Sequence, residues 1–215
     1  MRELSSGPVR SLLCLGAHCD DIEIGAGATI LKLVAEHPGL RVHWVVFSST
    51  DERANEARAS AAEFLATADD VDVQVKAFTD GFFPAEYAAI KRYFETLKDV
   101  VNPDLVLTHY RDDRHQDHRV ISDLTWNTFR DHLVLEYEVP KFDGDLGQPN
   151  VFVPVDDAVR AAKVQLLLHH YGSQSSKHWF TADTFNAMMR IRGLECRSGT
   201  GYAEAFHARK VVLGR

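Results

Sequence analysis

Short apolar runs alternate with amphipathic stretches along the first two thirds of the chain. Runs rich in β-branched and aromatic residues predict strands at residues 11–16, 41–48, 71–78, 104–109 and 133–139. Apolar residues three or four positions apart predict helices at residues 22–36, 52–66, 84–100 and 117–131. This regular alternation predicts an α/β fold, in which a doubly wound, mostly parallel sheet carries helices on both faces.

The last third of the chain begins with a turn-rich loop, KFDGDLGQPN, at residues 141–150. Loops of this kind often cover a substrate cleft, and we expect the same here. Helical patterns follow at residues 156–171 and 181–192, and a final strand is predicted at residues 203–213.

Composition and charge narrow the class of protein. A chain of 215 residues with 45 % hydrophobic content can bury one core, so we expect a single domain over residues 1–215. The net charge of −7 and the scattered basic residues argue against nucleic acid as a partner and favour a small-molecule substrate. The sequence leaves open whether the protein forms a homo-oligomer.

Three cysteines are widely spaced and form no C-x-x-C pair, so we expect free thiols and a reducing compartment. The longest apolar run near the N-terminus, Leu12 to Ala17, is too short to span a membrane. These observations predict a cytoplasmic protein without an integral membrane segment.

Two clusters of polar side chains stand where predicted strands end. His18, Asp20 and Asp21 follow the first strand, and the segment HQDH at residues 115–118 follows the strand at 104–109. Open α/β sheets place their ligand sites beyond the carboxyl ends of their strands. We therefore predict that the two clusters meet around one zinc ion.

The residue types in these clusters suit a catalytic zinc site, which uses three protein ligands and leaves a position for water. His18, Asp21 and His118 supply such a set, although iron or cobalt could occupy the same ligands. Asp20, beside a ligand but directed elsewhere, is placed to act as general base toward the water. His115 could stabilise an oxyanion, with the Asp117 carboxylate on its other ring nitrogen.

The motifs resemble a known family. The segments AHCDD at residues 17–21 and DRHQDH at residues 113–118 look like the paired AHPDD and HxDH motifs of the PIG-L/LmbE family of zinc-dependent N-acyl deacetylases. The segment RANE at residues 53–56 is similar to the R-x-x-E of that family, and YAEAF at residues 202–206 resembles its terminal AEAF. The resemblance spans nearly the whole chain and implies a Rossmann-like fold.

Carried over residue by residue, the resemblance implies zinc ligands at His18, Asp21 and His118 and a general base at Asp20. It also implies that His115 and Asp117 act together at the oxyanion and that Arg53 reaches toward the substrate. The substrates it implies are N-acetylated amino sugars or sugar conjugates. Cys19 stands where the family usually has proline, and we expect its thiol to point away from the metal.

Other interpretations remain beside this one. The enzyme could be an amidase for a bulkier sugar conjugate, or the chain could be a binding module that holds metal without turnover. Gly25 and Gly27 suggest a dinucleotide site only weakly, because the third glycine of that fingerprint is missing; close packing of the helix on the sheet explains them better. Five further residues have open roles, either structural or in the site: His109, His169, His170, Trp179 and Glu204.

Overall fold

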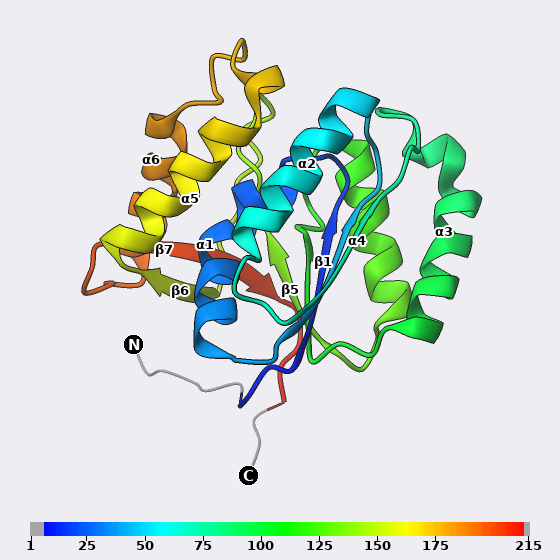
Figure 1. Ribbon diagram of the computed structural model, residues 1–215, viewed down its shortest axis with the longest axis horizontal. Helices are drawn as coiled ribbons and strands as arrows, with labels where there is room; N and C mark the ends of the chain where they lie inside the picture. The colour runs from blue at the N-terminus through cyan, green and yellow to red at the C-terminus, as the bar shows by residue number, and fades with distance from the viewer. Residues whose placement is uncertain (1–6, 213–215) are drawn as a thin grey trace.

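A twisted sheet runs through the middle of the computed structural model, which describes residues 7–212 (Figure 1). Within these residues the sheet has seven strands: β1 (Ser11–Gly16), β2 (Arg41–Val46), β3 (Asp70–Val75), β4 (Leu105–His109), β5 (Leu133–Tyr137), β6 (Val151–Val155) and β7 (Tyr202–Ala208). Their spatial order is β3-β2-β1-β4-β5-β7-β6. The first five strands pair in parallel, and β7 is antiparallel to both β5 and β6.

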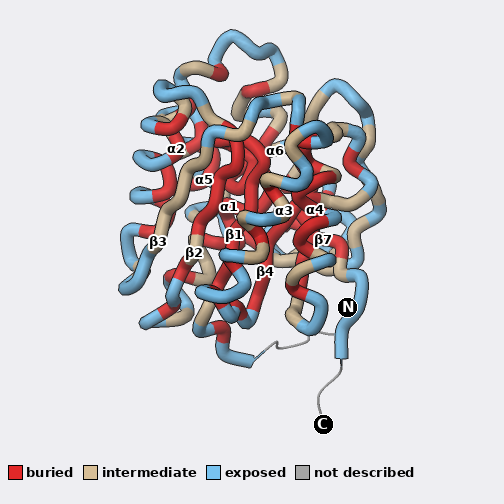
Figure 2. The backbone as a smooth tube through the Cα atoms, turned by 90° about the vertical axis from the view of Figure 1, so that its right-hand side faces the viewer, coloured by how far each residue is buried: buried red, intermediate tan, exposed pale blue. Residues whose placement is uncertain are grey.

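Helices cover both faces of this sheet. They are α1 (Asp21–Glu36), α2 (Asp51–Phe64), α3 (Phe83–Val100), α4 (Gln116–Thr128), α5 (Asp157–His170), the short 3₁₀ turn η1 (Gly172–Gln174) and α6 (Ala182–Glu195). Alternate residues of β1 belong to two separate cores: Leu12 is part of the core that includes residues of α1, α2, α5 and α6, whereas Leu13 is part of the core that includes residues of α3 and α4. Buried residues gather in the central strands and in the helix segments beside them (Figure 2).

Local sequence explains where several helices begin. The Thr50 hydroxyl accepts the backbone N–H of Arg53 at 3.4 Å, and Asp156 accepts that of Val159 at 2.8 Å. Both side chains satisfy N–H groups that have no partner inside the helix. Pro84 lies in the first turn of α3, where its missing N–H costs nothing.

The structure confirms the predicted fold class, a doubly wound α/β protein with a mostly parallel sheet. Strand β3 lies at one edge of the sheet. Strand β6 was not predicted, and the last strand ends at Ala208 rather than continuing to Leu213, which lies outside the described residues. The single domain over residues 1–215 stays a prediction.

Glycine lets α1 pack closely on the sheet. A Cβ atom on Gly25 would lie 2.1 Å from Cδ2 of Tyr137, and one on Gly27 would lie 2.8 Å from Cε1 of Phe64. Larger residues would push the helix away from its neighbours. The two glycines therefore allow close packing of α1, which is the interpretation that the sequence favours over a dinucleotide site.

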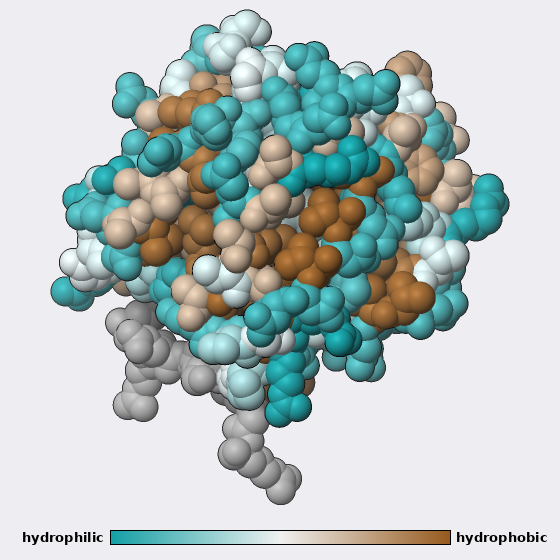
Figure 3. All heavy atoms as spheres, in the orientation of Figure 1, coloured by the Kyte–Doolittle hydropathy of each residue, from teal (hydrophilic) through white to brown (hydrophobic). Residues whose placement is uncertain are grey.

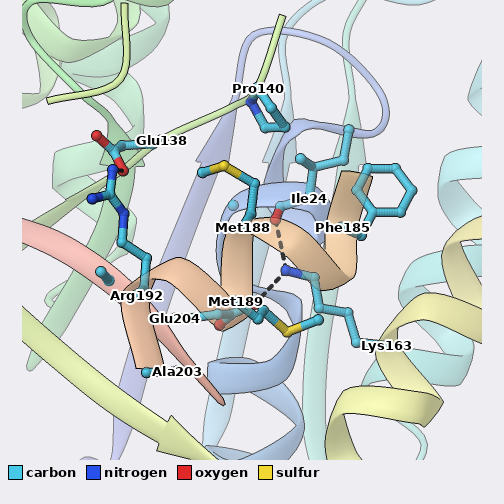
Figure 4. Close-up of a pocket in the computed structure, with 12 residues that line it drawn as sticks. Ile24, Glu138, Pro140, Lys163, Phe185, Met188, Met189, Arg192, Ala203 and Glu204 are labelled. Atoms are coloured by element: carbon cyan, nitrogen blue, oxygen red, sulfur yellow. Dashed lines mark hydrogen bonds and ion pairs between the residues drawn. The ribbon is translucent and has the colours of Figure 1, made fainter. Parts of the chain in front are cut away.

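A buried ion pair joins α1 to α5 and β7. The Lys163 ammonium group contacts the Glu204 carboxylate at 2.5 Å and donates to the backbone carbonyl of Ile24 at 2.7 Å (Figure 4). The same carboxylate accepts the N–H groups of Ala28 and Thr29 at 2.9 and 2.7 Å. Both charged side chains are only 3 % exposed, so each depends on the other for compensation.

The surface mixes polar and apolar residues. On the face shown in Figure 3, hydrophobic side chains form patches among hydrophilic ones. None of the helices in residues 7–212 combines the length and the apolar character that a membrane crossing needs. Cys14, Cys19 and Cys196 are free thiols, as expected.

Candidate active site

The carboxyl ends of β1 and β4 bring the two predicted clusters together. Strand β1 pairs with β2 on one side and β4 on the other, so the chain leaves the sheet in opposite directions at this point. Such a switch point opens a crevice at the carboxyl ends of the strands. The loop after β1 carries His18 and Asp20, Asp21 is the first residue of α1, and the first turn of α4 carries Asp117 and His118.

Three side-chain atoms form a compact triangle in this crevice. Nδ1 of His18 lies 3.2 Å from Nε2 of His118 and 3.3 Å from Oδ2 of Asp21. The third side, between His118 Nε2 and Asp21 Oδ2, measures 3.5 Å. Ligands about 2.0–2.2 Å from a tetrahedral zinc ion are about 3.3–3.6 Å apart, so the triangle has the dimensions of a zinc site.

Carboxylates orient both imidazole rings by binding the ring nitrogen that is not part of the triangle. Asp113 Oδ2 lies 2.9 Å from Nδ1 of His118, and Asp117 Oδ2 lies 3.3 Å from Nε2 of His18. Asp117 is itself fixed by the backbone N–H groups of Gly81 and Phe83. Protons on the outer ring nitrogens leave the inner two with lone pairs that face each other, an arrangement that a cation stabilises.

The surrounding carboxylates favour a positive charge at His18, which either a second proton on its ring or a bound cation supplies. Burial lowers the pKa of His18, but the carboxylates of Asp21, Asp117 and Asp80 together raise it well above its ordinary value. Burial and the neighbouring His109 lower the pKa of His118 to about 4, which keeps this ring neutral and able to bind a metal. The donor set and its charge therefore fit a divalent transition-metal ion.

Asp20 lies beside the triangle and contacts Arg53. Its Oδ1 accepts a hydrogen bond from Nη2 of Arg53 at 2.7 Å, and its side chain is only 6 % exposed. Burial raises the pKa of Asp20, Arg53 opposes this rise and Asp21 adds to it, and the net pKa is raised. A carboxylate with a raised pKa is a better proton acceptor near neutral pH.

His115 is the N-cap residue of α4. Its Nδ1 accepts the backbone N–H of Asp117 at 3.3 Å, which leaves Nε2 as the nitrogen that carries a proton in the neutral ring. Burial and the nearby His18 lower its pKa, so the neutral form is favoured. The expected bond between the Asp117 carboxylate and His115 is absent from the hydrogen bonds of residues 7–212, because that carboxylate binds His18 and the backbone of residues 81 and 83 instead.

A cleft of about 270 Å³ opens over these residues. Its walls include Asp20, Arg53 and His115, together with loop residues 141–143 and Lys177 and Trp179. Lys141 bridges Asp113 at 2.8 Å and Asp145 at 2.6 Å, which holds the loop at 141–150 against the cleft. The loop thus lies where the sequence suggested a cover for the site, and Trp179, whose role the sequence left open, lines the same cleft.

Two buried tyrosines bind the end of β1 and the loop that follows it. The hydroxyl of Tyr137 donates to the carbonyl of Leu15 at 2.6 Å, and that of Tyr171 donates to the carbonyl of Cys19 at 2.5 Å. The Cys19 thiol points to the carbonyl of Ser48 at 3.4 Å, away from the triangle as expected. These contacts fix the backbone that presents His18 and Asp20.

The structure brings all seven predicted site residues into or around one cleft, although their chemical roles remain proposals. Sequence reasoning underrated Asp113 and His109. His109 is fully buried, its Nε2 accepts the N–H of Ala17 at 2.9 Å, and its ring stacks on His118 with centroids 3.9 Å apart. The sequence could have indicated a role for His109 in the site, because it is the last residue of a buried strand. Asp80, which follows β3 and lies 3.1 Å from His18, gave no comparable signal.

Comparison with known proteins identifies the family. The fold is a Rossmann-like α/β fold, and the cleft with its candidate metal ligands lies at the switch point of the sheet. The model of the PIG-L family, described as GlcNAc-PI de-N-acetylase, matches residues 13–129. The chain belongs to this family, which confirms the resemblance seen in its motifs.

Solved structures share the fold at low sequence identity. N,N'-diacetylchitobiose deacetylase from Pyrococcus horikoshii is 17 % identical, with a TM-score of 0.70 and coverage of 93 % of this chain and 84 % of that one. The 4-carboxy-2-hydroxymuconate hydratase GalB from Pseudomonas putida KT2440 is 18 % identical, with a TM-score of 0.77 and coverage of 96 % and 98 %. A zinc-inhibited form of teicoplanin deacetylase is 15 % identical, with a TM-score of 0.70 and coverage of 92 % and 97 %.

Proposed function

We propose that the protein is a zinc-dependent hydrolase that removes an N-acyl group, most simply acetyl, from an amino sugar or sugar-containing small molecule. The observation that carries the proposal is the triangle of His18, Asp21 and His118, with edges of 3.2–3.5 Å, beside the buried carboxylate of Asp20. Membership of the PIG-L family and the likeness to a chitobiose deacetylase support the substrate class.

The ligands in this proposal are His18, Asp21 and His118. When bound there, a divalent ion supplies Lewis acidity and lowers the pKa of a coordinated water molecule. Asp113 and Asp117 orient the two histidine rings through their outer nitrogens. Iron or cobalt would fit the same donor atoms, and availability decides which ion is present.

The remaining steps are proton transfers and hydrogen bonds by residues of the chain. Asp20 takes a proton from the attacking water and later delivers it to the leaving nitrogen, so that the amide and water become a carboxylic acid and an amine. The N–H at Nε2 of His115 donates to the oxyanion that develops on the amide oxygen. Arg53 fixes the direction of the Asp20 carboxylate through their 2.7 Å contact.

Release of amine from a panel of N-acetylated amino sugars, with and without a chelator, tests this function. We expect amine release that is lost on chelation and restored by zinc. Release only from bulkier amides would replace the deacetylase with an amidase. Because a hydratase shares the fold, the panel should include hydration of an unsaturated acid, and activity there alone would refute the proposal.

A further inference from the structure

A second group of metal-binding side chains lies where the last turn of α2 meets the end of α5. Glu63, His169 and His170 each offer one donor atom, and the three atoms lie within 4.8 Å of one another. None of these residues lines the catalytic cleft. Two imidazoles and a carboxylate are donors of the same kind as those in the candidate active site, and they suit zinc and its neighbours.

His170 provides the first reason to expect a bound cation. Its side chain is 8 % exposed, and its Nε2 atom is buried without a hydrogen bond in the described structure. A buried nitrogen without a hydrogen bond costs free energy that a bond to a metal ion would remove. This nitrogen points toward Glu63, whose Oε1 lies 3.4 Å away, within the range of separations between two ligands of one zinc ion.

The two adjacent histidines are the last two residues of α5. Consecutive residues inside a helix do not face each other. Here the helix ends at His170, and Tyr171 has left the helical conformation with φ −99° and ψ 56°. The rings of His169 and His170 meet edge to face with centroids 4.9 Å apart. Glu63 and His169 are exposed, so both can rotate toward an ion that His170 holds from the buried side.

We propose that Glu63, His169 and His170 form a second transition-metal site, which takes Zn²⁺ and joins α2 to α5. Three protein ligands leave one position of a tetrahedral ion for water. Close by, Glu56 of α2 accepts the N–H of Ser173 at 2.8 Å and its hydroxyl at 2.5 Å, and Ser173 lies in η1, directly after α5. The ion would add a further connection between α2 and the end of α5. The chain continues from there to Lys177 and Trp179, which line the cleft.

Strands β2 and β3 offer a matched control. His43 and Asp72 form a histidine–carboxylate contact of the same length, 3.4 Å, on β2 and β3. No second histidine joins them among the metal-binding groups found in residues 7–212. The substitution His43→Gln therefore removes a comparable ion pair without removing a three-donor site.

Zinc stoichiometry after equilibrium dialysis of the folded protein is the test. We expect two zinc ions per chain for the wild type and for His43→Gln. We expect one for the double variant His169→Gln/His170→Gln and one for His18→Gln/His118→Gln. In the latter protein, added Zn²⁺ should raise the melting temperature, and this shift should vanish when His169 and His170 are also replaced.

Two results would overturn the second site. One is a single zinc ion in the wild type that is lost entirely in the His18→Gln/His118→Gln variant. The other is a second zinc ion that persists after both His169 and His170 are replaced. Because circular dichroism reports folding of each variant separately, loss of the ion can be distinguished from loss of the fold.

Discussion

Asp113 shows how much a single carboxylate can contribute to a histidine site. It is almost fully buried and contacts Nδ1 of His118 at 2.9 Å, while its other oxygen accepts the backbone N–H of His115 at 2.8 Å. Burial alone would raise its pKa, but His118 and Lys141 hold that pKa far below its ordinary value. Asp113 therefore remains ionised and fixes the ring of His118 for metal binding.

Replacing Asp113 by Asn should weaken metal binding by about 10–100-fold, because the outer nitrogen of His118 loses its anionic partner. Competition with a chromogenic zinc chelator measures this affinity. The neighbouring exposed Asp112 provides the control, and Asp112→Asn should bind zinc as the wild type does. Equal affinities for both variants would show that Asp113 does not support the site.

At the scale of elements, helix α1 depends on residues distant in sequence. Lys163 from α5 and Glu204 from β7 bind a carbonyl and two N–H groups of α1. Ile24, whose carbonyl Lys163 binds, donates its own N–H to the carbonyl of Asp20 at 3.0 Å. The ion pair is thus connected through one helical turn to the residues at the mouth of the site.

Removing one partner of this pair should destabilise the protein strongly. We expect Glu204→Gln to lower the free energy of unfolding by about 3–5 kcal/mol, because Lys163 then remains buried without a counter-charge. Urea unfolding followed by circular dichroism measures the loss. Asp157→Asn, which breaks a surface ion pair with Arg160 on α5, should cost less than about 1 kcal/mol. Similar losses in both variants would contradict a special role for the buried pair.

Glu138 joins three further elements at the end of β5. It contacts Arg192 of α6 at 2.6 Å and His207 of β7 at 3.2 Å, and it accepts the N–H of Gly147 in the cleft loop at 2.6 Å. Burial raises the pKa of Glu138, but these contacts outweigh burial and leave the pKa lowered. Since the folded protein favours the carboxylate, Glu138 stabilises the fold above the ordinary glutamate pKa, and this contribution is lost as the pH falls through the lowered value.

The stability gap between the wild type and Glu138→Gln should therefore depend on pH. We expect the gap to be largest near about pH 7 and to narrow below about pH 4, where the unfolded chain already binds the proton. Urea unfolding of both proteins at these pH values provides the comparison. A gap that stays constant or widens in acid would show that the charge of Glu138 contributes no stability.

At the scale of the whole molecule, the sequence predicts most of the fold because strands with uninterrupted apolar runs, such as β1 and β4, leave little ambiguity. Strand β6 escapes prediction because it is short, contains Pro154 and gains its hydrogen bonds only from β7, about 50 residues later. The extent of β7 is overpredicted for a related reason, since its pairing with β5 and β6 ends at Ala208.

The site was predictable to the extent that its residues stand at strand ends. His18 and His118 are separated by 100 positions, yet both follow neighbouring parallel strands, so the topology alone brings them together. The strand order does not predict which side chains of the site contact one another. Asp117 contacts His18 rather than His115, and Arg53 contacts Asp20, because these pairings depend on side-chain directions that no sequence pattern specifies.

The most direct test of the account is to measure zinc content and turnover together in the variant Asp20→Asn. Asp20 lies outside the triangle of donor atoms and contacts Arg53, so its replacement should leave zinc content at the wild-type level. Amine release should fall at least about 100-fold, because no other carboxylate is proposed to accept the proton from water. A variant that lost its zinc, or that retained wild-type turnover, would contradict the separation of metal binding from base catalysis on which the proposed function rests.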